Sequence, residues 1–235
     1  MKIGVFADPH YCSSDLLCRT RRPRLSYEKV RRVMERFAGE GVSYAVCMGD
    51  LTDHEETHDA ELARLREITA LIRSFGIPTC LIPGNHDYAS FSAHELETIG
   101  GFRTPPYSLE LPGLCWIVLD ANYRSGGGRF DVVGTDWKDA NLPPEQVGFL
   151  REKLAQTASP CWVLVHENLD PGVQVDHIIR NAAGVREILR ESGKVRMVLQ
   201  GHYHPGAEHT VDGIPYLTVP ALCEGETLPY RILEF

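Results

Sequence analysis

Seven short apolar runs alternate along the chain with segments of helical periodicity. These runs are "KIGVFA" (2–7), "YAVCM" (44–48), "IPTCLIP" (77–83), "LCWIVLD" (114–120), "CWVLV" (161–165), "VRMVLQ" (195–200) and "IPYLTVP" (214–220). Most are continuous rather than alternating, which is typical of strands covered on both faces. Their β-branched residues and the flanking Gly and Pro favour strand over buried helix. The pattern therefore predicts seven strands.

Four of the intervening segments carry an apolar stripe at helical spacing. They cover residues 26–41, 59–76, 142–156 and 181–193. Ser26 is the predicted N-cap of the first, and Gly76 ends the second. Strands alternating with helices predict an α/β layered fold. No fixed-period repeat or Ser- or Pro-rich linker divides the chain, so we expect a single domain over 1–235. Two long segments without periodicity, from 120 to about 141 and after His166, are typical of functional or mobile loops. The loops at 11–25, 120–141 and 167–180 are expected to decide the substrate.

Composition and charge narrow the class of protein. The 235 residues are 43% hydrophobic and 24% charged, which is ordinary for a soluble globular domain. A formal charge of −8 opposes nonspecific binding to nucleic acid. No apolar stretch approaches the roughly 18 residues of a membrane span, so no membrane partner is expected. Seven scattered cysteines without a C-x-x-C pair argue against a disulfide framework or a structural zinc cluster and favour the cytoplasm.

Polar side chains follow five of the apolar runs, close to where each run ends. The segments are "DPH" (8–10), "GDLTD" (49–53), "GNHD" (84–87), His166 and "GHYH" (201–204). In open α/β sheets, ligands bind at the carboxyl ends of the strands. Each segment alone is a weak signal because Gly, Asp and Asn are common in turns. Their combination in this order is specific and predicts a shared site.

The residue types in these segments indicate a metal centre. The seven candidate ligands are Asp8, His10, Asp50, Asn85, His166, His202 and His204. Carboxylates, imidazoles and one amide, without thiolate, suit Mn, Fe or Zn rather than an all-oxygen calcium site. One tetrahedral zinc needs fewer ligands, whereas two ions about 3.5–4 Å apart that share a carboxylate would use all of them. Glycines at 49, 84 and 201 would let the backbone turn sharply beside the ligands.

Together the motifs resemble the calcineurin-like metallophosphoesterase superfamily, and the resemblance runs from Asp8 to His204. It implies a four-layer α-β-β-α sandwich of two mixed sheets flanked by helices, with two transition-metal ions (Mn, Fe or Zn) at the sheet edge. By position, the first ion is held by Asp8, His10 and His204. Asp50 would bridge, and the second ion is completed by Asn85, His166 and His202.

The resemblance also implies a mechanism. A hydroxide held by the metals would attack phosphorus in line, and His86 would face the scissile ester rather than bind metal. His86 would stabilise the phosphoryl oxygens and protonate the departing alkoxide. Asp53 and Asp87 are interpreted as groups that orient the histidines, with solvated turn carboxylates as the alternative.

Within the superfamily, the chain is similar to the branch that includes class III cyclic nucleotide phosphodiesterases. Through "RNAAGVREIL" before "VLQGHYH" it is also similar to manganese-dependent ADP-ribose/CDP-alcohol diphosphatases. It departs from many relatives after His166, where "ENLDP" stands in place of a second histidine and a proline. The resemblance thus implies a small phosphorylated substrate that is nucleotide-derived.

One basic cluster, "CRTRRPR" (18–24), is either a solvated loop or a flap that grips a second phosphate. Arg21, Arg22 and Asn122 are candidate substrate contacts. Trp137, Tyr123 and Phe130 are candidates for stacking on a base, or for loop packing. The expected activity is hydrolysis of a small phosphodiester, phosphomonoester or nucleotide diphosphate. The alternatives are a nuclease or protein phosphatase with the same centre, and an inactive scaffold that keeps the fold.

Overall fold

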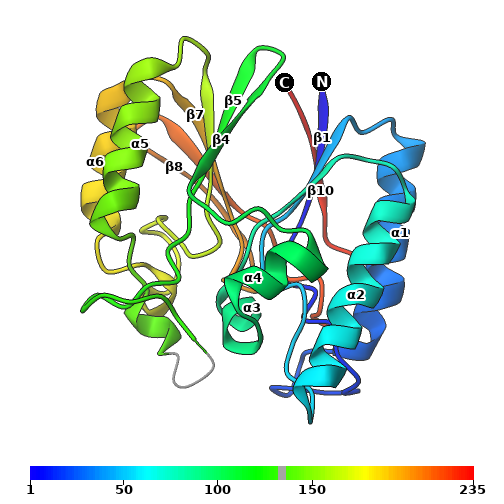
Figure 1. Ribbon diagram of the computed structural model, residues 1–235. Helices are drawn as coiled ribbons and strands as arrows, with labels where there is room; N and C mark the ends of the chain where they lie inside the picture. Colours follow the sequence, from blue (N-terminus) through cyan, green and yellow to red (C-terminus); the bar gives the residue numbers. More distant parts are fainter. Residues whose placement is uncertain (132–135) are drawn as a thin grey trace.

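The computed structural model describes residues 1–131 and 136–235, and it shows two β-sheets packed face to face. Helices lie on the outer face of each sheet (Figure 1). Over these residues, one sheet has four strands in the order β10-β1-β2-β3, and the other has six in the order β4-β5-β6-β7-β9-β8. Both sheets mix parallel and antiparallel pairs. The predicted four-layer α-β-β-α sandwich is confirmed.

The four-stranded sheet is built around three parallel strands, β1 (Lys2–Phe6), β2 (Tyr44–Cys47) and β3 (Thr79–Leu81). β10 (Arg231–Glu234) adds to β1 in the antiparallel direction. The helices α1 (Ser26–Gly39) and α2 (His58–Ser74) connect these strands and cover the sheet on its outer side (Figure 1).

In the six-stranded sheet, four central strands are parallel. They are β5 (Leu114–Val118), β6 (Cys161–Leu164), β7 (Val195–Gln200) and β9 (Ile214–Thr218). The edge strands β4 (Tyr107–Leu111) and β8 (Ala207–Val211) run antiparallel to their neighbours. The outer face is covered by α5 (Pro144–Gln156) and α6 (Ala182–Ser192) (Figure 1).

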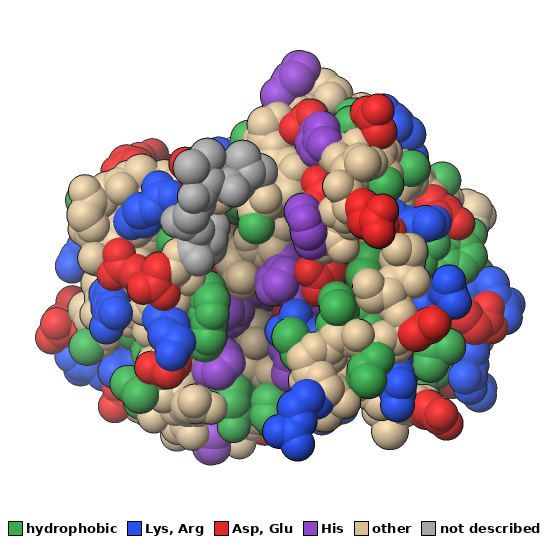
Figure 2. All heavy atoms as spheres, turned by 90° about the horizontal axis from the view of Figure 1, so that it is seen from below, with side chains coloured by type: hydrophobic (Ala, Val, Ile, Leu, Met, Phe, Trp, Pro, Cys, Tyr) green, Lys and Arg blue, Asp and Glu red, His purple; other side chains and the backbone are tan. Residues whose placement is uncertain are grey.

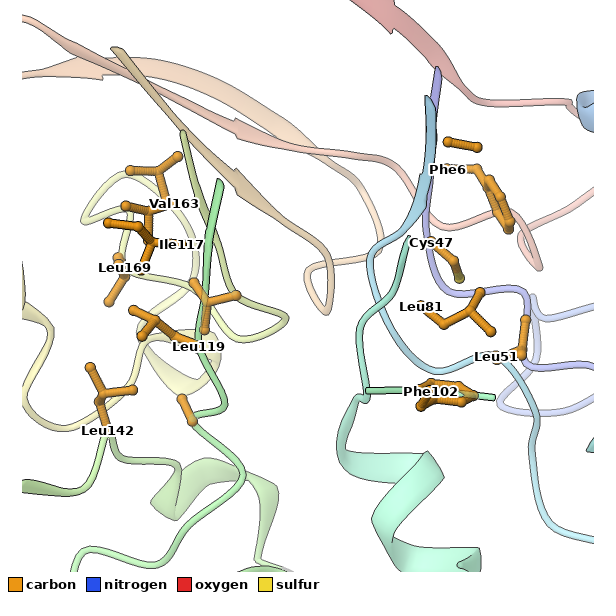
Figure 3. Close-up of a cluster of buried hydrophobic side chains, with 14 of the residues drawn as sticks. Phe6, Cys47, Leu51, Leu81, Phe102, Ile117, Leu119, Leu142, Val163 and Leu169 are labelled. Carbon is orange, nitrogen blue, oxygen red and sulfur yellow. The ribbon is translucent and has the colours of Figure 1, made fainter. Parts of the chain in front are cut away.

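Both sheets are buried on both faces, as their continuous apolar runs predict. Alternate residues of β1 and β5, among them Val5 and Trp116, pack together between the sheets. The residues that point outward contact the helices, and a Cβ on Gly4 would lie 2.6 Å from the ring of Phe37 in α1. Figure 3 shows part of the outward-facing layer, with Phe6 and Ile117 on opposite sides of the sandwich.

All seven predicted strands and all four predicted helices are present, whereas elements without an apolar signature were missed. β4, β8 and β10 are edge strands with few buried residues, so their sequences show no continuous apolar run. The short helices α3 (Asn85–Ser90) and α4 (Ala93–Glu95), and the π-helical turn Leu96–Gly100, were also missed. The N-cap prediction at Ser26 was wrong, because a 3₁₀ turn at Pro23–Leu25 leads directly into α1.

Three further features bear on function. Parallel strands from both sheets end on the same side of the molecule, so the loops that follow them lie together (Figure 1). All seven cysteines are free thiols within the described residues. Among those residues, no helix has both the length and the apolar character needed to cross a bilayer.

Part of the predicted loop 120–141, residues 132–135, lies outside the described residues.

Candidate metal centre

The loops at the strand ends surround a hollow in which histidine side chains gather (Figure 2). A cavity of 300 Å³ lies there. It is lined by Cys18, Arg21, Asp50, Asn85, His86, Trp137, His177, His202 and His204. The other three candidate ligands, Asp8, His10 and His166, are completely buried. Segments far apart in the sequence thus supply one compact site.

Asp50 lies between two of the histidines. Its Oδ2 is 3.4 Å from Nε2 of His10 and 3.4 Å from Nε2 of His166. Two donor atoms of one transition-metal ion with bonds of about 2.1 Å are about 3.0–3.4 Å apart. The same carboxylate oxygen therefore has a nitrogen at ligand spacing on each side, which is the arrangement of a bridging carboxylate.

On the His10 side, the second imidazole is that of His204. The Nε2 atoms of His10 and His204 are 3.2 Å apart, which again matches the spacing of two ligands on one ion. Cys223 also has its donor atom within 4.8 Å of both. Burial, the largest influence, raises the pKa of this thiol, and a protonated thiol is a poor ligand. The two imidazoles are the better donors.

On the His166 side, three donor atoms have no hydrogen-bond partner. Asp50, His166 and His202 place potential ligand atoms within 4.8 Å of one another. Asn85 Oδ1, His166 Nε2 and His202 Nε2 are buried and unpartnered in the part of the chain that the structure describes. Buried polar atoms are almost always satisfied, so such a group needs an explanation. A metal ion that accepts their lone pairs provides one.

The backbone at several candidate ligands adopts the left-handed region. The φ angles are 51° at Asp8, 47° at His10, 50° at Asp50 and 65° at His202. This conformation is uncommon for residues other than glycine and costs about 1–3 kcal/mol at each position. Strain of this kind persists where the surrounding structure holds it and is concentrated at functional sites.

At the three predicted glycines, neighbouring atoms lie too close to leave room for a larger side chain. This closeness explains the glycines better than a sharp turn of the backbone does. Only Gly49 has a positive φ, of 109°, and a Cβ there would lie 2.1 Å from Nδ1 of His166. A Cβ on Gly84 would lie 2.2 Å from Oδ1 of Asp50, and one on Gly201 would lie 2.7 Å from a main-chain oxygen. Larger residues at these positions would displace the ligands.

The histidines are oriented by acceptors behind them. Asp53 contacts His10 Nδ1 through Oδ2 at 3.2 Å and His86 Nδ1 through Oδ1 at 3.0 Å. The carbonyl of Met48 lies 2.6 Å from His166 Nδ1. Such contacts set which ring nitrogen faces the ion. Asp53 thus contacts both rings, and its role in orienting them stays a prediction.

The second predicted orienting carboxylate, Asp87, has different partners. It accepts the main-chain N–H groups of Leu51 at 3.1 Å and Gly84 at 2.9 Å, and so connects two of the loops. A residue missed by sequence reasoning, Glu224, lies 2.7 Å from His204 Nδ1. Glu224 follows an apolar run by a few residues, as the predicted ligands do, so the same pattern extended to the last strand would have found it.

The electrostatic environment keeps two of the candidate ligands neutral. Burial, and then the neighbouring His86, lower the pKa of His10 to about 3. Burial and the nearby Arg21 lower the pKa of His204 to about 4. The neutral imidazole is the form that binds a metal.

The two buried carboxylates require positive charge beside them. Burial raises the pKa of Asp8 to about 7. Burial would also raise the pKa of Asp50, but His166, His86 and His10 outweigh it and hold that pKa well below its usual value. In turn Asp50 overcomes the effect of burial on His166 and raises its pKa well above the usual range. A cation at this place can replace the proton on His166.

His86 has a potential ligand atom within 4.8 Å of those of His10 and Asp50, but it is less buried than either of them. It is the second residue of α3, is half-buried and lines the cavity, and its main-chain N–H donates to Asp50 Oδ1 at 2.8 Å. Burial lowers the pKa of His86, but Asp50 and Asp53 outweigh burial and raise it above the ordinary value. An imidazole that faces the cavity and retains its proton to higher pH is suited to act as a proton donor.

The three candidate substrate contacts separate in the structure. Arg21 lines the cavity, and its Nη1 is 3.5 Å from Oδ2 of Asp53. Arg22 is exposed and lies outside the cavity lining. Asn122 is completely buried, and its Nδ2 donates to Asp120 at 2.9 Å and to the carbonyl of Pro83 at 3.2 Å. Only Arg21 is positioned to reach a molecule in the cavity.

Aromatic rings form another part of the cavity wall. The ring centroid of Trp137 is 5.0 Å from that of His177 and 5.3 Å from that of His202. His177 was missed by sequence reasoning, because it lies in a loop without a pattern. The other two predicted stacking residues, Tyr123 and Phe130, are not part of the lining, and Phe130 is buried in the core.

The residue after His166 is buried rather than turned to the cavity. Glu167 is completely buried, and neither carboxylate oxygen has a partner among the described residues. Burial, the largest influence, raises its pKa to about 8, so the side chain is neutral at pH 7. Many relatives have a histidine at this position. Because Glu167 is buried here instead, no side chain from this position reaches the cavity.

The sequence of this chain is similar to those of known proteins. The calcineurin-like phosphoesterase family model matches residues 1–206. A probable cyclic nucleotide phosphodiesterase of Fibrobacter succinogenes is 21% identical over 208 residues, which are 87% of this chain and 73% of that protein. The 3′,5′-cyclic adenosine monophosphate phosphodiesterase CpdA of Haemophilus influenzae is 26% identical over 187 residues, 76% of this chain and 60% of that protein.

A similar fold is found among solved structures. The crystal structure of a dimetal phosphatase from Danio rerio superimposes with a TM-score of 0.83 at 19% identity. The match covers 98% of this chain and 91% of that chain. The same sandwich architecture thus extends over nearly the whole length of both proteins.

Proposed function

Since the chain belongs to the calcineurin-like phosphoesterases, a family of phosphoric ester hydrolases, we propose that it hydrolyses a small phosphate ester at a dinuclear metal centre. The substrate would be a phosphodiester, phosphomonoester or nucleotide diphosphate. The observation that carries the proposal is Asp50 Oδ2, which has His10 Nε2 and His166 Nε2 each at 3.4 Å.

The donor set fits two transition-metal ions. One would be held by Asp8, His10 and His204, the other by Asn85, His166 and His202, with Asp50 shared. When bound, the ions would supply Lewis-acid charge for the phosphoryl oxygens and lower the pKa of a water molecule. The chain's contribution is to present neutral imidazoles, because burial lowers the pKa of His10 and His204.

His86 would act on the leaving group. It reaches into the cavity from the first turn of α3, and Asp53 accepts its Nδ1 proton at 3.0 Å, so Nε2 is directed away from Asp53. The raised pKa lets His86 retain its proton to higher pH than an ordinary histidine, and this proton would go to the departing alkoxide.

A nucleotide-derived substrate fits the cavity walls. Arg21 supplies a guanidinium that can bind a phosphate, and Trp137 and His177 supply aromatic faces on which a base can stack. Two curated relatives carry the names of cyclic nucleotide phosphodiesterases, which supports the nucleotide class. The charge of −8 disfavours the alternative of a nuclease. The free cysteines fit a reducing compartment, so we include the cytoplasm in this proposal.

The proposal is tested by metal content followed by turnover. We expect the purified protein to retain about two transition-metal ions per chain, since the donor set fits a dinuclear site. Supplied with Mn²⁺, Fe²⁺ or Zn²⁺, it should then hydrolyse members of a panel of nucleotides, cyclic nucleotides and nucleotide diphosphates, and a chelator should stop turnover. Bound metal without turnover on any member would favour the scaffold alternative, and absence of bound metal would contradict the dinuclear centre.

Arg21 and Arg22 offer a matched pair for testing substrate contact. Replacing Arg21 by alanine should raise KM for a nucleotide diphosphate about 10- to 100-fold, the loss of one or two charge-assisted hydrogen bonds. Arg22→Ala should leave KM unchanged, because that side chain is exposed and its main-chain bond to Cys223 remains. Steady-state kinetics on the diphosphate and on a simple aryl phosphate measure both. Equal effects of Arg21→Ala on the two substrates would exclude a contact with a second phosphate.

Asp53→Asn tests the orientation of the two histidines. The amide keeps one acceptor but presents N–H to a ring N–H of His10 or His86, so one of the two contacts is lost. We expect metal affinity or kcat to fall about 10- to 100-fold, as for other groups that orient metal ligands. Asp59→Asn, an exposed change in the first turn of α2, is the control. Wild-type metal binding and wild-type kcat in Asp53→Asn would show that Asp53 is only a turn residue.

A further inference from the structure

A buried lysine contacts a chain segment beside the candidate metal centre and has no part in the proposed function. Lys29 belongs to the first turn of α1 and is only 4% exposed. Its Nζ donates to three main-chain carbonyls, those of Leu222 at 2.7 Å, Glu224 at 3.1 Å and Gly225 at 2.7 Å. The three N–H groups of the ammonium thus have their acceptors in one short segment after β9.

Neither the helix nor the core explains a lysine at this position. The first turn of a helix is the positive end of its dipole, so a cation there is unfavourable. Burial of a charged group is costly as well, and an apolar side chain such as methionine would fill a similar space without that cost. The partners of Lys29 are carbonyls rather than a carboxylate. What the lysine supplies is therefore a set of donors to one segment.

This segment, 221–225, is bonded to two of the loops that carry candidate ligands. The N–H of Ala221 donates to the carbonyl of His204 at 3.0 Å. The N–H of Cys223 donates to the carbonyl of Asp8 at 3.1 Å. The segment 221–225 thus connects the main chain of Asp8 with that of His204, and both residues are assigned to the first ion.

Glu224 extends the connection to the imidazole of His204. Its Oε1 is 2.7 Å from Nδ1 of His204, and Nε2 of the same ring is 3.2 Å from Nε2 of His10. A carboxylate at one ring nitrogen fixes the tautomer and the orientation of a metal-binding histidine. Glu224 can do this only while its own main chain is held, and Lys29 Nζ bonds to the carbonyl of Glu224.

We propose that Lys29 is a positioning residue of the metal centre. It would hold the segment 221–225, which in turn fixes the Glu224 carboxylate against His204 and supports the main chain at Asp8. This role rests on the proposed dinuclear centre, and it makes the affinity of the first metal position depend on a side chain of α1 that binds neither ion. Lys29 acts through Glu224 and takes no part in the reaction itself.

Lys29→Met removes the three donors, and Lys194→Met is a matched control. Nζ of Lys194 also donates to three carbonyls, those of Leu154, Ala155 and Thr157 at 2.7, 3.3 and 2.7 Å, but these lie at the end of α5. Chelator-treated proteins are titrated with Mn²⁺ by calorimetry, at a temperature where unfolding curves show each variant to be folded. In Lys29→Met one of the two binding steps should weaken about tenfold or more, as for other groups that support metal ligands. Both steps in Lys194→Met should equal wild type.

A lysine that only stabilises the fold would give a different result. Equal weakening of metal binding in Lys29→Met and Lys194→Met would overturn the positioning role. Lys29→Gln keeps two N–H groups on a shorter side chain and is the milder variant if Lys29→Met does not fold. It should weaken the same binding step by a smaller factor. Wild-type affinity in every folded variant of Lys29 would also overturn the proposal.

Hydrogen exchange in the metal-free protein tests the segment itself. The N–H groups of Leu222 and Cys223 donate to the chain that follows β1. In the Lys29 variants they should exchange about tenfold faster or more, because bonds from a charged donor no longer hold the segment. Lys194→Met should leave their exchange unchanged. Unchanged exchange in the Lys29 variants would refute the proposal, and since this measurement needs no bound ion, its result is separate from that for the dinuclear centre.

Discussion

Asp50→Asn is expected to remove most of the hydrolase activity and both bound ions. The variant replaces the shared carboxylate, whose Oδ2 faces His10 and His166, by a neutral amide of the same size. Each metal position loses a charged ligand. Asn85 Oδ1, His166 Nε2 and His202 Nε2 would then be buried with neither a hydrogen-bond partner nor a metal ion. Metal ions contribute several kcal/mol to stabilising the transition state of phosphoryl transfer. A loss of about 4 kcal/mol corresponds to about 10³-fold in rate.

Metal content and kcat are to be measured together on the Asp50→Asn protein. A matched change at an exposed carboxylate, Asp59→Asn, should leave both at the wild-type value, since Asp59 lies at the solvent-facing start of α2. A thermal unfolding curve distinguishes lost metal from lost fold. If Asp50→Asn retained both ions and more than about a tenth of kcat, the bridging role would be wrong.

The second large effect is expected from His86→Ala, and it should depend on the leaving group. A well-placed general acid contributes about 10²–10⁴ in rate when the departing alkoxide needs a proton. We expect a loss of that size for an alkyl or nucleoside ester. A p-nitrophenyl ester leaves without a proton, so the loss there should stay within about tenfold. Both rates come from the same purified variant, and its metal content should be unchanged.

The pH profile gives an independent readout of His86. Burial lowers the pKa of this imidazole, but Asp50 and Asp53 outweigh burial, so the net pKa is raised and the proton is retained to higher pH. Activity on a poor leaving group should therefore fall on the alkaline side, at a pH above the ordinary histidine value of about 6.5. This limb should be missing in His86→Ala. An identical rate loss on esters of both leaving groups would show that His86 does not transfer a proton. His94→Ala, which replaces another histidine, is the matched control.

Most of the sandwich could be predicted because its strands are covered on both faces. Burial on two sides demands continuous apolar runs, and such runs are visible in a sequence. Strand β8 is largely exposed, with Glu208 and His209 facing solvent, so its sequence needs no continuous apolar run. For this reason it was missed. Its position is determined by pairing with β9, which is a tertiary contact rather than a local pattern.

The proximity of the candidate ligands could be predicted for a related reason. Parallel strands end at one edge, so polar residues after several apolar runs must lie near one another. His10 and His204 are far apart in the sequence, yet their Nε2 atoms are 3.2 Å apart. The position of the residues at the carboxyl end of a strand follows from the fold, whatever the loop conformation beyond it.

Side chains that depend on loop conformation could not be assigned from the sequence. Arg21 and Arg22 are adjacent and chemically identical, but only Arg21 lines the cavity. His177 lies in the loop after β6, where no apolar pattern marks its direction. Asn122 points into a buried network of hydrogen bonds instead of the cavity. In each case a turn of the backbone decides the outcome, and composition does not specify that turn.

The left-handed backbone at Asp8, His10, Asp50 and His202 has a consequence for engineering the protein. Glycine at any of these positions would relieve the local steric conflict, and asparagine would tolerate it at the histidines. Directed evolution for heat resistance alone would thus favour variants that have discarded the chemistry. Libraries aimed at a more robust catalyst should hold these codons constant and diversify the outer faces of α1, α2, α5 and α6 instead.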